Sequence, residues 1–316
     1  MNKFWILPVA MCLLFGGCHR QTGKFSPELD YSVQDKYLLK LPTPFPTLTE
    51  AERHQDWGKE YTVGVGFSHQ LDLYQAMTAF KRAEILAPQE ETQRVLEMRY
   101  DIVLCYYLGH RYADVVYAFE QGSLHTVTPE FPAFHDLLVI LYDSYQKLDE
   151  PEKAENILAL IRTHYPGTAQ KLELSHAITK AKFSQLGQFA ASEPTNPAIN
   201  VFLDNYQSQK KKPRTAQLLN AALPGAGYFY LGQPQSGMTA IFLNGLFLAA
   251  TYACFHNDQY AAGAILLSFE CGWYFGGIVG AGLEAKHYNE RLYERLASPL
   301  MQTERLFPVL MLRYGF

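Results

Sequence analysis

The sequence predicts an all-α protein in which a helical repeat array is followed by a transmembrane helical hairpin. A pattern of small and large residues recurs at a fixed spacing between residues 76 and 166. Charged residues then almost disappear from residues 215–283, where Asp258 and Glu270 are the only two. The mean hydropathy of −0.13 is typical of a soluble protein, but it averages two chemically different halves. A chain of 316 residues is long enough for two domains.

The N-terminal residues 1–17 have the pattern of a secretory signal peptide. A charged Lys3 precedes an apolar stretch over residues 4–15, and Gly16-Gly17-Cys18 follows. The cysteine after two small residues resembles the lipobox of bacterial lipoproteins, which implies that Cys18 is acylated and becomes the new N-terminus. A plain cleaved signal, an uncleaved anchor and a buried helix are the alternatives. Residues 18–57 are expected to form an extended tether because they contain Pro27, Pro42, Pro44 and Pro46.

Three sequence units carry the repeat. The first has Ala76, Phe80, Ala83 and Pro88, and the third has Ala154, Leu158, Ile161 and Pro166 at the same offsets. The middle unit keeps the first three positions as Val115, Phe119 and Gly122, so successive units lie 39 residues apart. Offsets of four and seven share one helix face and predict a packing stripe, whereas the proline falls past the helix end.

These units resemble the tetratricopeptide repeat, or TPR, which has small, large, small and proline residues at these offsets. The third unit also matches the family's first helix, which ends at Tyr145, although the period exceeds the family's 34 residues. The resemblance implies three helix pairs in a domain of residues 58–190, with a capping helix over residues 169–186. It also implies a concave groove for a protein or peptide partner. Six tyrosines would line either that groove or the core: Tyr74, Tyr106, Tyr107, Tyr112, Tyr117 and Tyr142.

A membrane domain is predicted over residues 215–290, after a linker at residues 191–214. Residues 237–255 carry no charge and residues 260–283 carry only Glu270. Each stretch reaches the roughly 20 residues that a helix needs to cross a bilayer. The join between them is so short that the two helices must be antiparallel.

The preceding residues 215–231 are apolar but interrupted by Pro224, Gly225 and Gly227. Proline ends a helix and glycine frees the backbone, so a short interfacial or re-entrant helix and a turn are expected. The stretch from Leu223 to Gly232 is similar to the start of TM2-type domains. This resemblance implies residence in a membrane.

Small and polar residues mark faces of the two predicted membrane helices. Small residues recur every four positions and favour close helix packing: Gly245, Ala249 and Ala253 in one helix, and Gly272, Gly276 and Gly280 in the other. Asn244 and Glu270 lie at nearly equal distances from the turn, so both are expected at the same depth in the bilayer. Because a charged acid is costly there, we expect Glu270 to be protonated or hydrogen-bonded, with Asn244 as its partner. One interface between the two helices cannot hold both the stripes and the polar pair. Either the hairpin packs on the stripes and the polar pair faces the Pro224 segment, or the stripes serve homo-oligomerisation.

The topology of the membrane domain is open to two interpretations. Basic residues flank the hairpin on both outer sides, from Lys210 to Arg214 and at Lys286, Arg291 and Arg295, which the positive-inside rule places in the cytoplasm. An exported N-terminus would instead place the repeats in the periplasm, and we favour this orientation. The tail over residues 291–316 is expected to contain an edge strand or a segment at the membrane surface.

Several function classes lack support. The net charge of −4 offers no basic surface for nucleic acid. Neither the ten histidines nor the five cysteines form a metal or disulfide pattern, and His135-Asp136 is assigned a surface or capping role. With no predicted catalytic, metal or cofactor residue, the expected function is a non-enzymatic TPR scaffold held at the bacterial envelope by lipid and helices, acting in envelope assembly. The alternative is a small oligomeric transporter or channel component in which Glu270 is functional.

Overall fold

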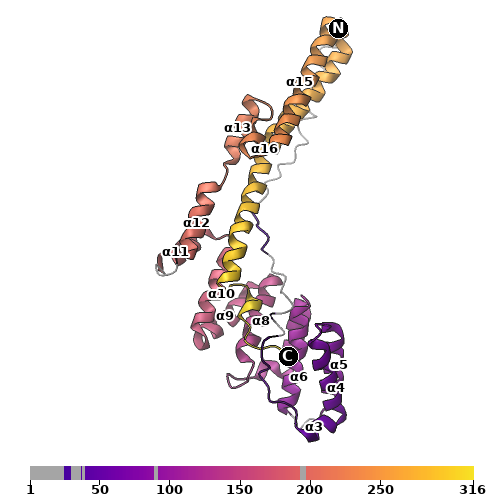
Figure 1. Cartoon of the computed structure of the whole chain (residues 1–316), viewed down its shortest axis with the longest axis vertical. Coiled ribbons are helices and arrows are strands. Elements are labelled where there is room, and N and C mark those ends of the chain that lie inside the picture. Colours follow the sequence, from indigo (N-terminus) through magenta and orange to yellow (C-terminus); the bar gives the residue numbers. More distant parts are fainter. Residues whose placement is uncertain (1–24, 30–36, 38–39, 89–91, 193–196) are drawn as a thin grey trace. The chain divides into compact units, whose positions relative to one another are not determined.

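The computed structural model describes residues 25–29, 37, 40–88, 92–192 and 197–316. The predicted signal peptide and Cys18 lie outside these residues. Every regular element in the described part of the chain is a helix (Figure 1), which confirms the all-α fold class. The chain divides into two compact units, described separately below. The repeat unit comprises the described residues between 37 and 189 together with residues 298–316. The unit that contains the two predicted membrane helices, called the membrane unit below, comprises residues 25–29 and the described residues between 190 and 297.

The repeat unit consists of successive helices that pack as antiparallel neighbours. After the short α3 (Glu50–His54), α4 (Asp56–Ser68) packs on α5 (Leu73–Leu86), α6 (Thr92–Leu108) on α7 (Tyr112–Gln121), and α8 (Phe134–Lys147) on α9 (Pro151–His164). A single 3-10 turn, η1 (Ser123–Thr126), follows α7. Leu71, His110 and Asp149 join the helices of the three pairs in the left-handed conformation. Their spacing is again 39 residues, so the turn recurs with the sequence repeat.

The residues of the repeated pattern form the packing stripe that the sequence predicts. Most of them are at most 4 % exposed: Ala76, Phe80, Ala83, Val115, Tyr145, Ala154, Leu158 and Ile161. Phe119 is half-buried against the same core, Gly122 caps α7, Pro88 lies beyond the end of α5 and Pro166 begins α10. Of the six tyrosines, Tyr106, Tyr107 and Tyr142 are buried in this core, whereas Tyr74 and Tyr117 are exposed.

Gly64 allows α4 and α5 to pack closely, and this can be tested. A Cβ atom at Gly64 would lie 2.6 Å from the Phe80 ring, whereas one at Gly66 in the same helix would meet nothing within 4 Å. We expect Gly66→Ala to raise the free energy of unfolding by up to about 1 kcal/mol through helix propensity. Gly64→Ala should lower it by about 1–3 kcal/mol through overpacking. Chemical unfolding of both variants in detergent micelles measures the difference, and equal effects would contradict the close contact.

The array continues beyond the predicted capping helix. Residues 169–186 do not form one helix: α10 (Pro166–Thr179) ends, Ala181 takes the left-handed conformation, and α11 (Phe183–Ser192) begins. This turn repeats the geometry of the three preceding pairs. The prediction of a single cap was therefore wrong, because nothing in the sequence at residues 180–182 resembles the earlier turns.

The membrane unit contains more helix than the sequence predicts. Residues 191–214 were assigned to a linker, but α12 (Ala198–Gln209) lies within them. The rings of Phe202 and Tyr206 pack edge-on against Tyr293, with centroids 5.2 and 5.5 Å away. Lys211 is fixed through its backbone, since its N–H donates to Asn289 Oδ1 at 2.7 Å and its carbonyl accepts from Asn289 Nδ2 at 2.8 Å. The start of the lysine run is therefore ordered.

The two predicted spans lie in α15 (Pro234–His256) and at the start of α16 (Tyr260–Thr303). Both helices are long and apolar enough to cross a membrane. They are antiparallel and lie side by side near the turn (Figure 1), where a Cβ at Gly263 would be only 2.8 Å from the Phe255 ring.

The predicted short helix and turn before the hairpin are present as α13 (Pro213–Ala222) and α14 (Ala226–Tyr230). Gly225 joins them with φ of +92°, a conformation that side chains with a Cβ rarely adopt. Its N–H donates to Asn220 Oδ1 at 2.9 Å, and Asn220 is itself buried. The turn is therefore held by a side chain of the preceding helix.

Candidate functional site

Helices α6 and α8 are buried around nearly their whole circumference. Every residue from Tyr100 to Tyr107 in α6, and from Phe134 to Tyr142 in α8, is buried. A helix at the surface of a protein buries only one stripe. Neighbouring helices cover part of this circumference, since α6 packs against α5 and α7, and α8 packs against α7 and α9. More of it is covered by two segments from opposite ends of the repeat unit, residues 41–48 and residues 306–316.

The first covering segment, residues 41–48, is part of what the sequence predicts as a tether. Phe45 is 5 % exposed and packs against Tyr100, with ring centroids 5.8 Å apart. Arg94 Nη1 donates to the carbonyl of Pro46 at 2.8 Å. The backbone is extended, as the prolines require, but it is packed against α6. The prediction of a tether is therefore wrong for residues 41–48. The residues that they contact lie about 50 positions later in the chain, so no local pattern indicates this packing.

The second covering segment, residues 306–316, is called the tail segment below. After α17 (Pro308–Met311) it is extended, and its backbone is held by one side chain of α8. Asp136 Oδ2 accepts hydrogen bonds from the N–H groups of Arg313 and Tyr314, both at 2.8 Å. Asp136 Oδ1 lies 2.6 Å from His135 Nδ1. A fully buried carboxylate is tolerated here because donors satisfy both of its oxygens.

Apolar and backbone contacts complete the docking of the tail segment. Leu312 is 3 % exposed, and the Phe316 ring stacks on Phe80 with centroids 6.1 Å apart and planes at 16°. The Gly315 N–H donates to the carbonyl of Pro42 at 3.0 Å, so the two covering segments also bond to each other.

Two predictions are corrected by this arrangement. The tail segment is not an edge strand, because residues 306–316 form no strand and pack on α8 within the repeat unit. His135 and Asp136 are 4 % and 0 % exposed rather than on the surface. No local sequence pattern predicts the docking of the tail segment or the burial of Asp136, because the residues that bond to Asp136 lie 177 and 178 positions later in the chain.

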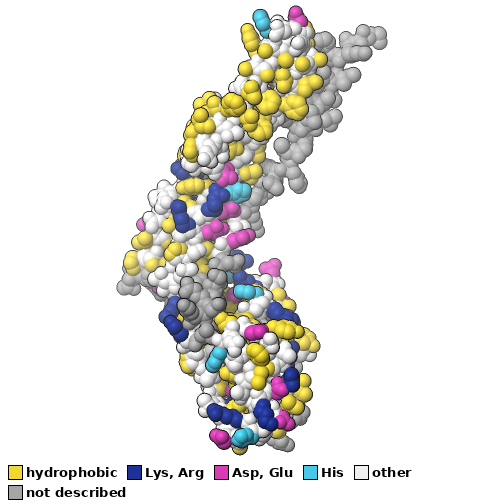
Figure 2. Space-filling model, turned by 45° about the vertical axis from the view of Figure 1, so that its right-hand side comes forward, with side chains coloured by type: hydrophobic (Ala, Val, Ile, Leu, Met, Phe, Trp, Pro, Cys, Tyr) yellow, Lys and Arg dark blue, Asp and Glu magenta, His cyan; other side chains and the backbone are white. Residues whose placement is uncertain are grey.

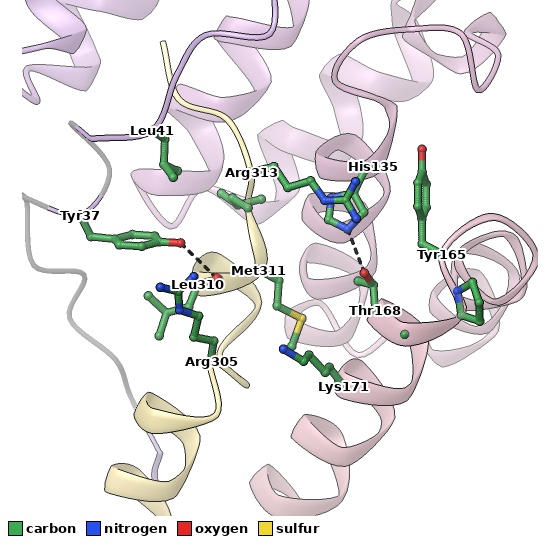
Figure 3. A pocket seen from close by; sticks show the side chains of 13 residues that line it. Tyr37, Leu41, His135, Tyr165, Thr168, Lys171, Arg305, Leu310, Met311 and Arg313 are labelled. Atoms are coloured by element: carbon green, nitrogen blue, oxygen red, sulfur yellow. Dashed lines mark hydrogen bonds between the residues drawn. The ribbon is translucent and has the colours of Figure 1, made fainter.

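A cavity of about 670 Å³ lies beside the tail segment (Figure 3). Tyr37 OH donates to the carbonyl of Leu310 at 3.2 Å on one side, and His135 Nε2 is hydrogen-bonded to Thr168 Oγ1 at 3.0 Å on the other. Three cationic side chains from different elements, Lys171, Arg305 and Arg313, also line it. None of these three forms an ion pair with another described residue, so the cavity is chemically suited to an anionic group.

A buried polar network joins α4 to α6 in the repeat unit. Tyr61 OH donates to Glu97 Oε1 at 2.7 Å and to Asp101 Oδ2 at 3.1 Å. Arg94 pairs with Glu97 at 2.7 Å and with Glu52 at 2.8 Å. The hydrogen bond from Arg94 lowers the pKa of Glu52 to about 2, whereas burial raises the pKa values of Glu97 and Asp101.

Burial of Asp101 gives the repeat unit a pH-dependent stability. Because its pKa is raised in the folded state, its contribution is most favourable below its ordinary value of 3.8 and is lost as pH rises toward the folded pKa. Asp101→Asn keeps an oxygen for Tyr61 but carries no charge. We therefore expect the variant to match the parent near pH 4 and to exceed its Tm by about 4 °C at pH 8.

Thermal unfolding between pH 4 and pH 8 measures this difference. Asp114→Asn is the control, because Asp114 is an exposed partner of Arg111. A gain for Asp101→Asn that is the same at every pH would show that ionisation is not the cause.

In the membrane unit, the polar pair is buried but does not form the predicted bond. Asn244 and Glu270 are 4 % and 5 % exposed. Asn244 Nδ2 donates to the carbonyl of Ala240 at 2.7 Å. Asn244 Oδ1, Glu270 Oε2 and the hydroxyl of Thr251 have no hydrogen-bond partner among the described residues. The predicted hydrogen bond between Asn244 and Glu270 is therefore absent from this structure.

The buried residues of α15 identify the face on which it packs. Gly237, Asn244 and Thr251 lie seven positions apart, so they share one face. The small-residue stripes lie elsewhere: Gly245, Ala249, Ala253, Gly272 and Gly276 are exposed, and a Cβ at Gly245, Gly272 or Gly276 would meet nothing within 4 Å. Gly280 differs, because its Cβ would lie 2.8 Å from Tyr228 OH.

A second cavity, of about 1060 Å³, lies between the hairpin and the Pro224 segment. Asn244 lines it together with Pro224 and Tyr228, and Gly272 and Gly276 do so from α16. Asn244 is therefore turned toward the Pro224 segment, as one of the two alternatives expects, whereas Glu270 does not line this cavity. That alternative also has the hairpin pack on its small-residue stripes, and this part is wrong because most of these residues are exposed.

Two cavities in the described part of the chain are candidate ligand sites. Within the described residues no group of three His, Cys, Asp or Glu side chains could hold a metal ion. Both cavities are lined by apolar and hydrogen-bonding side chains, an arrangement suited to holding a ligand. No protein-family model, curated protein or solved structure matches this chain.

Proposed function

We propose that this protein is a non-enzymatic TPR scaffold anchored in the membrane of a bacterial cell envelope, where it recruits a protein or peptide partner. The recurrent left-handed turn and the buried stripe support this most directly, because both return every 39 residues. Helix pairs of this kind stack into arrays whose surfaces bind peptides and proteins. A role in envelope assembly is supported by residues 161–168, which resemble the ends of repeats in envelope lipoproteins that assist outer-membrane or peptidoglycan assembly.

Anchoring in a membrane is supported by the surface of the hairpin. Large apolar side chains of α15 are exposed along the helix, among them Met238, Phe242, Leu246 and Tyr252. Figure 2 shows hydrophobic side chains gathered over this hairpin, whereas Lys, Arg, Asp and Glu gather elsewhere. Such a surface is stable against lipid and costly in water. Sodium carbonate washing should leave the full chain in the membrane pellet, and release into the supernatant would contradict membrane insertion.

The partner-binding role can be tested by photo-crosslinking in living cells. A photoreactive residue at Tyr117, which is 68 % exposed on the repeat unit, should yield protein adducts. The same residue at Tyr252, which is 71 % exposed on α15, should react with lipid instead. Scanning further exposed positions of α5, α7 and α9 maps the surface, and a scan without any protein adduct would contradict recruitment.

A small oligomeric transporter or channel is the second candidate, because three buried polar atoms of the hairpin have no hydrogen-bond partner among the residues that the structure describes. Glu270→Gln separates the two functions. A scaffold retains its crosslinked partners and its cellular phenotype, whereas a proton or ion pathway that uses the carboxylate loses its activity. Asn257→Ala is the control, since the exposed Asn257 donates to the carbonyl of Ala253 at the end of α15 and does not line the cavity that contains Asn244.

Orientation is tested by a reporter fused after Lys212. Export of the N-terminus predicts a periplasmic reporter, with the repeat unit on the same side. Activity of a cytoplasmic reporter at this position would reverse the proposed orientation.

A further inference from the structure

We propose that the tail segment is an exchangeable occupant of a peptide-binding surface, and that a partner peptide binds by displacing it. This surface consists of Asp136, Phe80, Tyr165 and the carbonyl of Pro42, and the name tail-binding surface is used for it below. The inference rests on the proposed scaffold function and specifies where a partner peptide binds.

The backbone contacts are those of a bound peptide. Two successive N–H groups of an extended chain donate to one buried carboxylate, Asp136, at 2.8 Å each. A third N–H, that of Gly315, donates to the carbonyl of Pro42 at 3.0 Å. These bonds require only an extended backbone without proline at the bonded positions. Any peptide of that kind can replace the tail segment in them.

The side-chain contacts define which peptides fit best. The Arg313 guanidinium lies 5.3 Å from the centroid of the Tyr165 ring, a cation–π arrangement. Three residues later, Phe316 stacks on Phe80. The preferred partner is therefore an extended peptide with an arginine or lysine followed, three positions on, by an aromatic residue.

The exposure of the tail segment indicates where it can open. Leu306, Phe307 and Leu310 are at most 7 % exposed and anchor it in the core. Beyond α17, Leu312 and Gly315 are buried, but Arg313 is exposed and Tyr314 and Phe316 are only half-buried. Lifting residues 312–316 uncovers Leu312 but leaves Leu306, Phe307 and Leu310 in place, so it exposes less apolar area than removing the whole tail segment. Because the segment is covalently attached, its local concentration is on the order of millimolar, and a free peptide competes poorly with it.

The test compares the intact chain with a chain that ends at Met311, both in detergent micelles. The probe is a fluorescent synthetic peptide with the sequence of residues 312–316, which are the residues that the shortened chain lacks, and binding is measured by anisotropy. The shortened chain should bind the peptide at least tenfold more tightly than the intact chain. Asp136→Asn in the shortened chain, or proline in place of Tyr314 in the peptide, should weaken binding at least tenfold. A folded shortened chain that does not bind the peptide would overturn the proposal, as would equal binding by the two chains.

Hydrogen exchange on the intact chain tests the proposal without truncation. If residues 312–316 open locally, the amides of Arg313 and Tyr314 exchange at least tenfold faster than the amides in the middle of α8. Equal rates would mean that the segment leaves only when the unit unfolds, and would also overturn the proposal. The scaffold function is tested separately by crosslinking at Tyr117. If protein partners are still crosslinked there after a negative peptide-binding or hydrogen-exchange result, only the tail-binding surface is rejected.

Discussion

Replacing Asp136 with alanine is expected to free the end of the tail segment. The variant loses two hydrogen bonds from backbone N–H groups to a buried carboxylate, and bonds to charged groups contribute about 1.5–3 kcal/mol each. We expect the free energy of local opening to fall by about 3 kcal/mol, which corresponds to roughly 100-fold faster amide exchange. Mass spectrometry of hydrogen exchange in peptides covering Arg313 and Tyr314 measures this change.

Asp143→Ala provides a matched control on the same helix. Asp143 is a half-buried carboxylate that accepts a hydrogen bond from Tyr107 OH at 2.7 Å and makes no hydrogen bond to the described residues of the tail segment. Its loss should leave exchange at Arg313 and Tyr314 within about twofold of the parent, because only local opening controls that exchange. If both variants accelerated exchange equally, Asp136 would have no specific role in docking the tail.

Gly225→Ala is expected to have the largest effect in the membrane unit. Its φ of +92° disfavours any residue with a Cβ, and the added atom would lie 2.3 Å from the carbonyl oxygen of Gly237. The obstacle is backbone rather than a flexible side chain, so α14 and α15 must separate. We expect a loss of about 3 kcal/mol or more, a sum of left-handed strain and overpacking. Unfolding in increasing mole fractions of dodecyl sulfate, followed by circular dichroism, measures it.

Gly232→Ala separates the two causes of this loss. Gly232 also has a positive φ, of +76°, but a Cβ there would meet nothing within 4 Å. Its substitution should therefore cost only the conformational strain of about 1–2 kcal/mol. Equal losses for Gly225→Ala and Gly232→Ala would show that contact with the Gly237 carbonyl is unimportant.

Local patterns were sufficient to predict most of the helices. The stripe at Ala76, Phe80 and Ala83 identified a helix face because helical periodicity is a property of neighbouring residues. The hairpin followed from the length of its uncharged stretches, and Pro224 with Gly225 predicted a turn whose glycine has a positive φ in the structure. Each of these inferences needs only residues within one or two helical turns.

Contacts between distant residues could not be predicted in this way. Pro42, Pro44 and Pro46 were assigned to a tether because the residues that cover Phe45 come much later in the chain. Asn244 and Glu270 were expected to bond because they share a depth, but depth does not determine side-chain orientation. The Asn244 amide donates within its own helix instead.

The amino-acid order alone determined that this chain is helical, that its first part repeats and that its second part is suited to lipid. Those properties arise from short-range periodicity and composition. Only the tertiary structure decided that residues 41–48 and the tail segment cover α6 and α8, and that Asp136 holds the tail segment. Burial of a carboxylate against N–H groups 177 and 178 positions away depends on how the whole chain folds back, and no local pattern encodes it.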